Sequence, residues 1–276
     1  MIAVVFSLLS ALAYGISDFL GGIFTKATSP WKVATIGQLS STVCVAVAAP
    51  FIVGSPVAGD FGWAALAGLG SGLGGAFLYR GLARAKMSVV APISAVGCAL
   101  IPVAVGLAIG ERPSMLALIG IAAAFPAIWL ISRRSDNDPS HHGGIVDGVL
   151  AGIGFGVMFV ALAQVDDEAG LWPITLMYAV STTAVAIVAM ATGERPLPAG
   201  RSGWAPVMLG PVGVFAVLTF WAATGHGLLS VVSVITALYP ASTVLLAAMI
   251  LHERVQRTQG FGLLLAALAV ACVAAG

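Results

Sequence analysis

The sequence predicts an all-α membrane protein in which ten transmembrane helices form an inverted five-plus-five repeat. Three observations predict this fold: the composition, the number and length of the apolar segments, and a match between the two halves of the chain. Of the 276 residues, 59% are apolar and only 8% are charged, whereas soluble domains are about 25% charged. So few charged side chains cannot cover the surface of a water-soluble fold of this size. We therefore expect a protein that crosses the bilayer several times.

Ten apolar segments are each long enough to cross about 30 Å of hydrocarbon, which takes about 20 helical residues. Only helices and closed barrels satisfy their own backbone polar groups in lipid, and these segments are too long for barrel strands. They cover approximately residues 2–24, 33–53, 63–82, 87–109, 114–132, 144–164, 172–192, 204–223, 229–251 and 258–275. No Lys or Arg precedes Lys26, so the first segment lacks the positive start of a signal peptide and is expected to be a retained span.

The two halves of the chain match each other in register. The matched pairs are Trp31/Trp172 and Trp63/Trp204, which share one sequence offset, and Glu111-Arg112/Glu253-Arg254, whose offset is longer by a single position. We interpret residues 1–135 and 143–276 as two copies of a five-helix unit. Because five is odd, the second copy enters the membrane from the opposite side. Inverted repeats of this kind are typical of transporters, with the solute site between the copies near the midplane.

The basic residues indicate an orientation. Of the 12 Lys and Arg residues, all but Arg112 lie in or beside the odd-numbered connections. Basic residues concentrate on the cytoplasmic side of membrane proteins. This bias places both termini outside the cytoplasm, in a multi-pass protein of the plasma or inner membrane.

Composition and spacing exclude several other classes. The balance of 12 basic and 11 acidic residues provides no basic surface for nucleic acid. Cys44, Cys98 and Cys272 lie in apolar segments without metal-ligand spacing, and no cofactor is expected. No nucleotide-binding motif is present, so uphill transport must use an ion or solute gradient. The four histidines lie at span edges or in the central connection, which argues against a lipid-modifying membrane enzyme.

A glutamate follows the fourth span of each half, and a glycine-containing apolar helix follows each glutamate. The residues are Gly110-Glu111-Arg112 and His252-Glu253-Arg254, with Gly120 and Gly262, and the span prolines Pro92, Pro102 and Pro240. Together with the ten-span architecture, they resemble the EamA-type family of the drug/metabolite transporter superfamily, over essentially the whole chain. The resemblance implies a carrier, often an exporter, of small organic metabolites such as amino acids or drug-like solutes. It also implies a cavity lined mainly by spans 1, 3, 4, 6, 8 and 9, and cytoplasmic termini, so the orientation stays open.

Asp18 is the one acid well inside a predicted span. It lies eight residues before Lys26, about 12 Å along a helix from that interface. A carboxylate at the centre of a bilayer costs roughly 2.5–3.5 kcal/mol and therefore needs a partner, water or a proton. We interpret Asp18 as a proton-coupling or substrate-amine site; the alternative is a carboxylate that reaches an interfacial Lys or Arg, or caps a broken helix.

Two further charged residues lie near span ends. Arg80 is expected to be an interfacial anchor whose side chain reaches the headgroups, or alternatively a residue of the cavity mouth that pairs with a substrate carboxylate. Asp147, at the start of the sixth span, is expected to be interfacial.

The ninth span carries Ser233, Thr236, Pro240 and Thr243 on one helical face. This stripe is either a cavity wall, with Ser94 as the repeat counterpart of Thr236, or ordinary helix packing. Tyr239 and Trp221 could close the cavity or stack on an aromatic solute, or simply pack. Gln38 in the second span could hydrogen-bond a solute or a neighbouring helix.

The sequence thus predicts a secondary-active carrier, an exporter of small organic solutes, that works by alternating access and requires no partner chain. Protons are the candidate coupling ion. The candidate substrate-binding residues are Asp18, Gln38, Arg80, Ser94, Trp221, Ser233, Thr236, Tyr239 and Pro240. A passive channel and a membrane subunit without transport activity remain the alternatives.

Overall fold

The computed structural model describes residues 1–84, 87–132, 142–198, 201–252 and 255–276. All regular structure in these ranges is helical, so the predicted all-α class is confirmed. Nine helical segments of the described chain are long and apolar enough to cross a membrane. A shorter apolar segment, Ile93–Ala108, lies at the position of the predicted fourth span.

The helices follow the predicted segments closely along the chain. They are α1 (Ile2–Thr25), α2 (Pro30–Ala48), α3 (Ala58–Arg84), α4 (Met87–Ala108), α5 (Met115–Ser132), α6 (His142–Leu162), α7 (Trp172–Ala191), α8 (Leu209–Thr224), α9 (Leu229–Thr236), α10 (Tyr239–Ile250) and α11 (Arg257–Ala275), with the 3-10 helices η1 (Ala49–Phe51) and η2 (Arg201–Met208).

Two predicted spans are not single α-helices. The eighth begins in η2, which leads directly into α8. The ninth is divided into α9 and α10 at Ala237 and Leu238. Pro240 explains this division, because it lacks an N–H and its ring conflicts with a continuous helix through Thr236.

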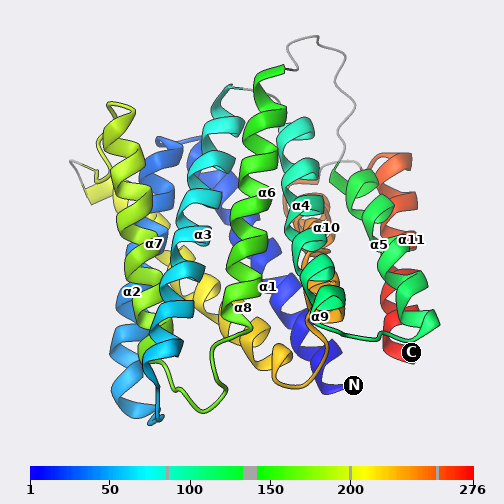
Figure 1. Ribbon diagram of the computed structural model, residues 1–276. Helices are drawn as coiled ribbons and strands as arrows, with labels where there is room; N and C mark the ends of the chain where they lie inside the picture. The colour runs from blue at the N-terminus through cyan, green and yellow to red at the C-terminus, as the bar shows by residue number, and fades with distance from the viewer. Residues whose placement is uncertain (85–86, 133–141, 199–200, 253–254) are drawn as a thin grey trace.

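Figure 1 shows the helices side by side, with both chain termini at the same end of the bundle. α1 starts at this end, whereas α6 starts at the opposite end, so the two helices run in opposite directions. The first-half helix α3 packs against α6 and α7 of the second half. In turn, α8 packs against α1 and α2.

Two groups of buried apolar side chains form the interior. One includes Met177, Phe159 and Phe220, and connects α6, α7 and α8 with parts of α1, α2 and α3. The other includes Ile128 and Ile235, and connects α4, α5, α9, α10 and α11. α1 contributes Ala3 to the first group and Val4 to the second, so it joins the two.

Glycines bring α5 and α11 into close contact at matching positions. A Cβ added to Gly120 would lie 2.7 Å from a methyl carbon of Val273, and one added to Gly262 would lie 2.8 Å from the backbone nitrogen of Ile131. Gly120 and Gly262 are separated by the same offset as the two Glu-Arg pairs, and so are Ile131 and Val273. The two contacts therefore join equivalent positions of the two halves.

The contacts of α1 and α6 show the same correspondence. A Cβ on Gly15 would lie 2.8 Å from the carbonyl oxygen of Tyr239 and 3.0 Å from the nitrogen of Thr243. A Cβ on Gly156 would lie 2.8 Å from Cβ of Ile101. Gly15 and Gly156 are separated by the offset of the Trp pairs, and Ile101 and Thr243 by the offset of the Glu-Arg pairs. These two contacts therefore involve residues that are related by the offsets of the matched pairs.

Glu111 joins the two halves near the end of the bundle that carries the termini. One carboxylate oxygen accepts a hydrogen bond from the backbone N–H of Leu229 at 2.6 Å, and the other accepts from that of Ser230 at 3.0 Å. These groups are at the start of α9, where a helix has unpaired N–H groups and a favourable field for a negative charge. Glu111 of the first half thus caps a helix of the second half, and its counterpart Glu253 lies outside the described residues.

Gly15→Ala should destabilise the protein, because the new Cβ meets the backbone of α10. Overpacking of this kind costs about 1–3 kcal/mol of unfolding free energy. Gly22→Ala on the same helix is a matched control, since nothing lies within 4 Å of a Cβ there; it should be neutral or slightly stabilising because alanine favours helix. Thermal unfolding in detergent measures both. Equal melting temperatures for the two variants would contradict the proposed packing role of Gly15.

Glu111→Ala should lower the free energy of unfolding by about 1–2 kcal/mol, because it removes the cap of α9. Glu194→Ala is the control: Glu194 occupies an identical Gly-Glu-Arg tripeptide but is exposed and has only a 3.4 Å contact with Ser29. We expect a lower melting temperature for Glu111→Ala alone. A Glu111→Ala variant that melts at the same temperature as Glu194→Ala and the wild type would show that the cap contributes nothing.

Candidate functional site

A cavity of about 150 Å³ lies in the middle of the bundle, where helices of the two halves meet. Its lining residues come from α1, α2, α3 and α4 of the first half, and from α6, α7, α8 and α10 of the second. The family resemblance implied spans 1, 3, 4, 6, 8 and 9; the structure adds α2 and α7. At about 30 Å³ for each water of the liquid, this volume holds roughly five waters or a small solute.

Asp18 reaches this cavity from α1, one helical turn beyond Tyr14. Although it lies in the interior of a span, its side chain is exposed, which we attribute to the partly open cavity. Access to water lowers the cost of a carboxylate inside the membrane. Tyr14 and Tyr239 lie close enough to interact with its charge. Among the lining residues that the structure describes, Asp18 is the sole charged one.

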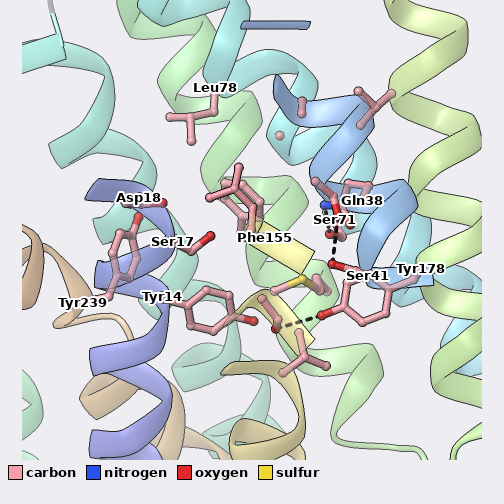
Figure 2. Close-up of a pocket in the computed structure, with 18 of the residues that line it drawn as sticks. Tyr14, Ser17, Asp18, Gln38, Ser41, Ser71, Leu78, Phe155, Tyr178 and Tyr239 are labelled. Carbon is pink, nitrogen blue, oxygen red and sulfur yellow. Dashed lines mark hydrogen bonds between the residues drawn. The ribbon is translucent and has the colours of Figure 1, made fainter. Parts of the chain in front are cut away.

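Polar groups of α2, α3 and α7 lie across the cavity from Asp18 (Figure 2). The side-chain nitrogen of Gln38 lies 3.5 Å from the hydroxyl oxygen of Ser71, which also accepts from Ser181 at 3.3 Å. The hydroxyl of Tyr178 donates to the carbonyl of Gly213 at 2.9 Å. The side-chain oxygen of Gln38 is buried and has no hydrogen-bond partner among the described atoms.

Aromatic side chains form one wall of the cavity. Phe159 stacks on Phe220 with ring centroids 4.2 Å apart. Tyr14 lies 6.1 Å from Phe159 and 6.3 Å from Tyr239, again between centroids. The hydroxyl of Tyr14 is buried without a described hydrogen-bond partner. This wall therefore combines ring faces with one unpaired hydroxyl.

Three of the predicted binding residues line the cavity: Asp18, Gln38 and Tyr239. Tyr239 is placed there by the break in the ninth span, since it is the first residue of α10. Pro240 causes that break but is not among the described lining residues. The structure thus brings residues of α1, α2 and α10 together around one space.

Arg80 lies elsewhere, paired with a buried acid. Its Nε donates to a carboxylate oxygen of Asp147 at 2.9 Å, and its guanidinium lies 4.7 Å from the ring centroid of Phe77. The Asp147 side chain is only 4% exposed, which corrects the expectation that it is interfacial. Because the guanidinium is already bound to Asp147, Arg80 joins α3 to α6 and is not among the described lining residues.

The remaining predicted residues are packed between helices. Ser94, Ser233 and Thr236 are fully buried, and their hydroxyls have no hydrogen-bond partner among the described atoms. The indole nitrogen of Trp221 donates to the carbonyl of Val165 at 3.0 Å, which fixes α8 to the end of α6. None of the four is among the described lining residues of the cavity.

The sequence interpretation missed several lining residues, among them Tyr14, Ser71 and Tyr178. Tyr14 could have been found, because a residue four positions before Asp18 shares its helical face. Ser71 lies in a glycine-rich part of α3, and Tyr178 in a span with many hydroxyl residues, so no local pattern distinguishes them. Only the contact of α3 with α7 brings them together.

Comparisons with known proteins agree with this architecture. The sequence model of the EamA-like transporter family matches residues 142–275. A solved structure titled "Crystal structure of protein" superposes with a TM-score of 0.75 at 18% identity, over 98% of this chain and 95% of that chain. At this identity the likeness shows the fold alone. The comparison with curated proteins gave no match.

The match of the family model agrees with the resemblance found in the sequence. Residues 142–275 of the chain belong to the EamA-like transporter family, which identifies the protein as a multi-pass membrane transporter and not an enzyme.

Proposed function

We propose that this EamA-like transporter is a secondary-active carrier that exports a small organic solute by alternating access, as a monomer in the cell membrane. The observation that carries the proposal is the cavity between helices of the two halves, with an aromatic wall and an exposed carboxylate, that of Asp18. A carrier needs a central site of this kind that is reached from one side at a time.

The paired helix contacts support an inverted repeat as the basis of alternating access. The sequence offset of the Glu-Arg pairs relates Gly120 to Gly262 and Ile131 to Val273. The contact of Gly120 with Val273 therefore corresponds to the contact of Gly262 with Ile131. The packing of α3 on α6 and α7 has its counterpart in α8 on α1 and α2. The family model matches residues 142–275, which is almost the whole proposed second unit. A scaffold with this symmetry can form two similar packings that open toward opposite sides.

The two ends of the bundle carry different closing contacts at equivalent positions. Arg80 and Asp147 join α3 to α6 toward one end. At the offset of the Trp pairs, Arg80 corresponds to Trp221 and Asp147 to Phe6. Trp221 and Phe6 belong to the apolar group that also includes Phe159 and Phe220. In alternating access, the ion pair separates while the apolar contacts at the other end stay formed, and the reverse holds in the opposite orientation. The proposal therefore assigns Arg80 to a gate and not to the solute.

Asp18 is the group best placed to couple transport to protons. Its carboxyl lies within a span and opens onto the cavity, so it can exchange a proton with water on the side to which the cavity opens. A carboxyl that takes up a proton in one orientation and releases it in the other transfers that proton across the membrane.

Asp18→Asn should abolish solute accumulation driven by a pH gradient, because an amide cannot exchange a proton. The measurement uses proteoliposomes with an imposed pH gradient and labelled tyramine or tyrosine as probes. Asp18→Glu, which keeps the carboxyl, should retain part of the accumulation. Glu194→Gln changes an exposed acid beyond the end of α7 and should behave as wild type. Undiminished accumulation by Asp18→Asn would remove Asp18 from the coupling mechanism. Counterflow by the wild-type protein separates a carrier from a passive channel.

Labelling of single cysteines tests the inverted repeat directly. Ala27 and Glu168 are exposed residues that follow α1 and α6. In a background without Cys44, Cys98 and Cys272, Ala27→Cys and Glu168→Cys should react with a membrane-impermeant maleimide from opposite sides of the membrane. The charge bias predicts that Glu168→Cys is labelled in intact cells. Labelling of both positions from the same side would show that the two units are not inverted.

A further inference from the structure

We infer that the cavity selects a small aromatic amine in its cationic form, and that it discriminates against the corresponding amino acid and carboxylic acid. This inference rests on the proposed function, because it names the solute of the same cavity. It follows from three features of the described lining: the charge, the ring faces, and the unpaired polar atoms.

The charge of the lining favours a cation. Asp18 is the sole charged residue of the described lining. Arg80 is not among the described lining residues, and its guanidinium is bound to Asp147. A solute carboxylate would thus enter a space with an acidic group and no described cation to pair with, which Coulomb repulsion disfavours. An ammonium group would pair directly with Asp18 and form a charge-assisted hydrogen bond.

The aromatic wall lies beside the same carboxylate. Tyr14 and Tyr239 are tilted to each other by 54°, and Tyr14 and Phe159 by 55°. Figure 2 shows Asp18 next to Tyr239, with Tyr14 below them. Faces of aromatic rings attract cations, more strongly where water is partly excluded. An ammonium at Asp18 would therefore contact both a carboxylate and tyrosine rings, and an attached aromatic ring would pack against Phe155 or Phe159, which also line the cavity.

The opposite side of the cavity is polar but neutral. Gln38, Ser71 and Ser41 lie there, across from Asp18 (Figure 2). The Gln38 side-chain oxygen has no partner among the described atoms and can accept a hydrogen bond from a hydroxyl or N–H of the solute. The hydroxyl of Ser41 already donates to backbone carbonyls of Gly37 and Gly210. A solute with an ammonium at one end, a ring in the middle and a neutral donor at the other matches this arrangement.

The reason to exclude an amino acid is the position of its carboxylate. In a zwitterion the carboxylate is one carbon away from the ammonium, so an ammonium at Asp18 would hold two carboxylates close together. The decarboxylated amine avoids this repulsion while keeping every favourable contact. The cavity should therefore discriminate between two solutes that differ only in this group.

Four probes with one hydroxyphenyl ring test the inference: tyramine is a cation, tyrosine a zwitterion, 3-(4-hydroxyphenyl)propionate an anion, and 4-ethylphenol neutral. Titration calorimetry on the purified full-length protein at neutral pH gives each Kd. Tyramine should bind at least tenfold more tightly than tyrosine, and the propionate more weakly than tyrosine. Asp18→Asn should weaken tyramine at least tenfold and leave 4-ethylphenol unchanged, while Glu194→Gln should change neither.

If Asp18→Asn does not give a monodisperse protein, the four probes on the wild type decide the question alone. Absence of tyramine binding, or tyrosine or the propionate binding as tightly as tyramine, would overturn the inference. Counterflow of tyrosine in that case would leave the carrier proposal standing. Tyramine binding with the expected selectivity but without tyramine counterflow would support the inference on the ligand and contradict the carrier.

Discussion

The fold depends on close backbone contact between helices, because lipid provides no hydrophobic force to bring them together. Acyl chains are as apolar as leucine side chains, so helices in a bilayer associate through packing and polar contacts. Glycines provide these contacts here: Gly15 lies against the backbone of α10, Gly120 against α11 and Gly68 against α7. The cavity lies between helices of the two halves, and Asp18 and Gln38 are among its lining residues.

Much of the fold could be predicted from the sequence, because bilayer thickness fixes the length of a span. The apolar segments gave the helices to within a few residues at most ends, and the Glu-Arg motifs pointed to the correct family. The break at Ala237 and Leu238 was less predictable, since Pro102 and Pro126 lie inside unbroken helices. A proline interrupts a span only where the surrounding helices satisfy the freed backbone groups.

The candidate site was predicted in part. Asp18 was conspicuous because a charge inside a span is costly, and the structure places it on the cavity. The binding role predicted for Arg80 was not supported, because its guanidinium is paired with Asp147. Asp147 is distant in sequence, and only the packing of α3 on α6 brings the two residues together. The capping role of Glu111 was not predicted, because the N–H groups that it binds belong to the other half. Long-range pairing of this kind is absent from local sequence patterns.

Arg80 and Asp147 form an ion pair, whereas their counterparts Trp221 and Phe6 belong to an apolar cluster. Salt screens a buried ion pair less than an exposed one, and the Asp147 side chain is only 4% exposed, whereas apolar contacts weaken on cooling. Temperature should therefore act mainly on the apolar side of the proposed passage. A backbone with the proposed symmetry that carries such different side chains has no reason to populate its two orientations equally. The side chains in which the two halves differ set the orientation that it favours.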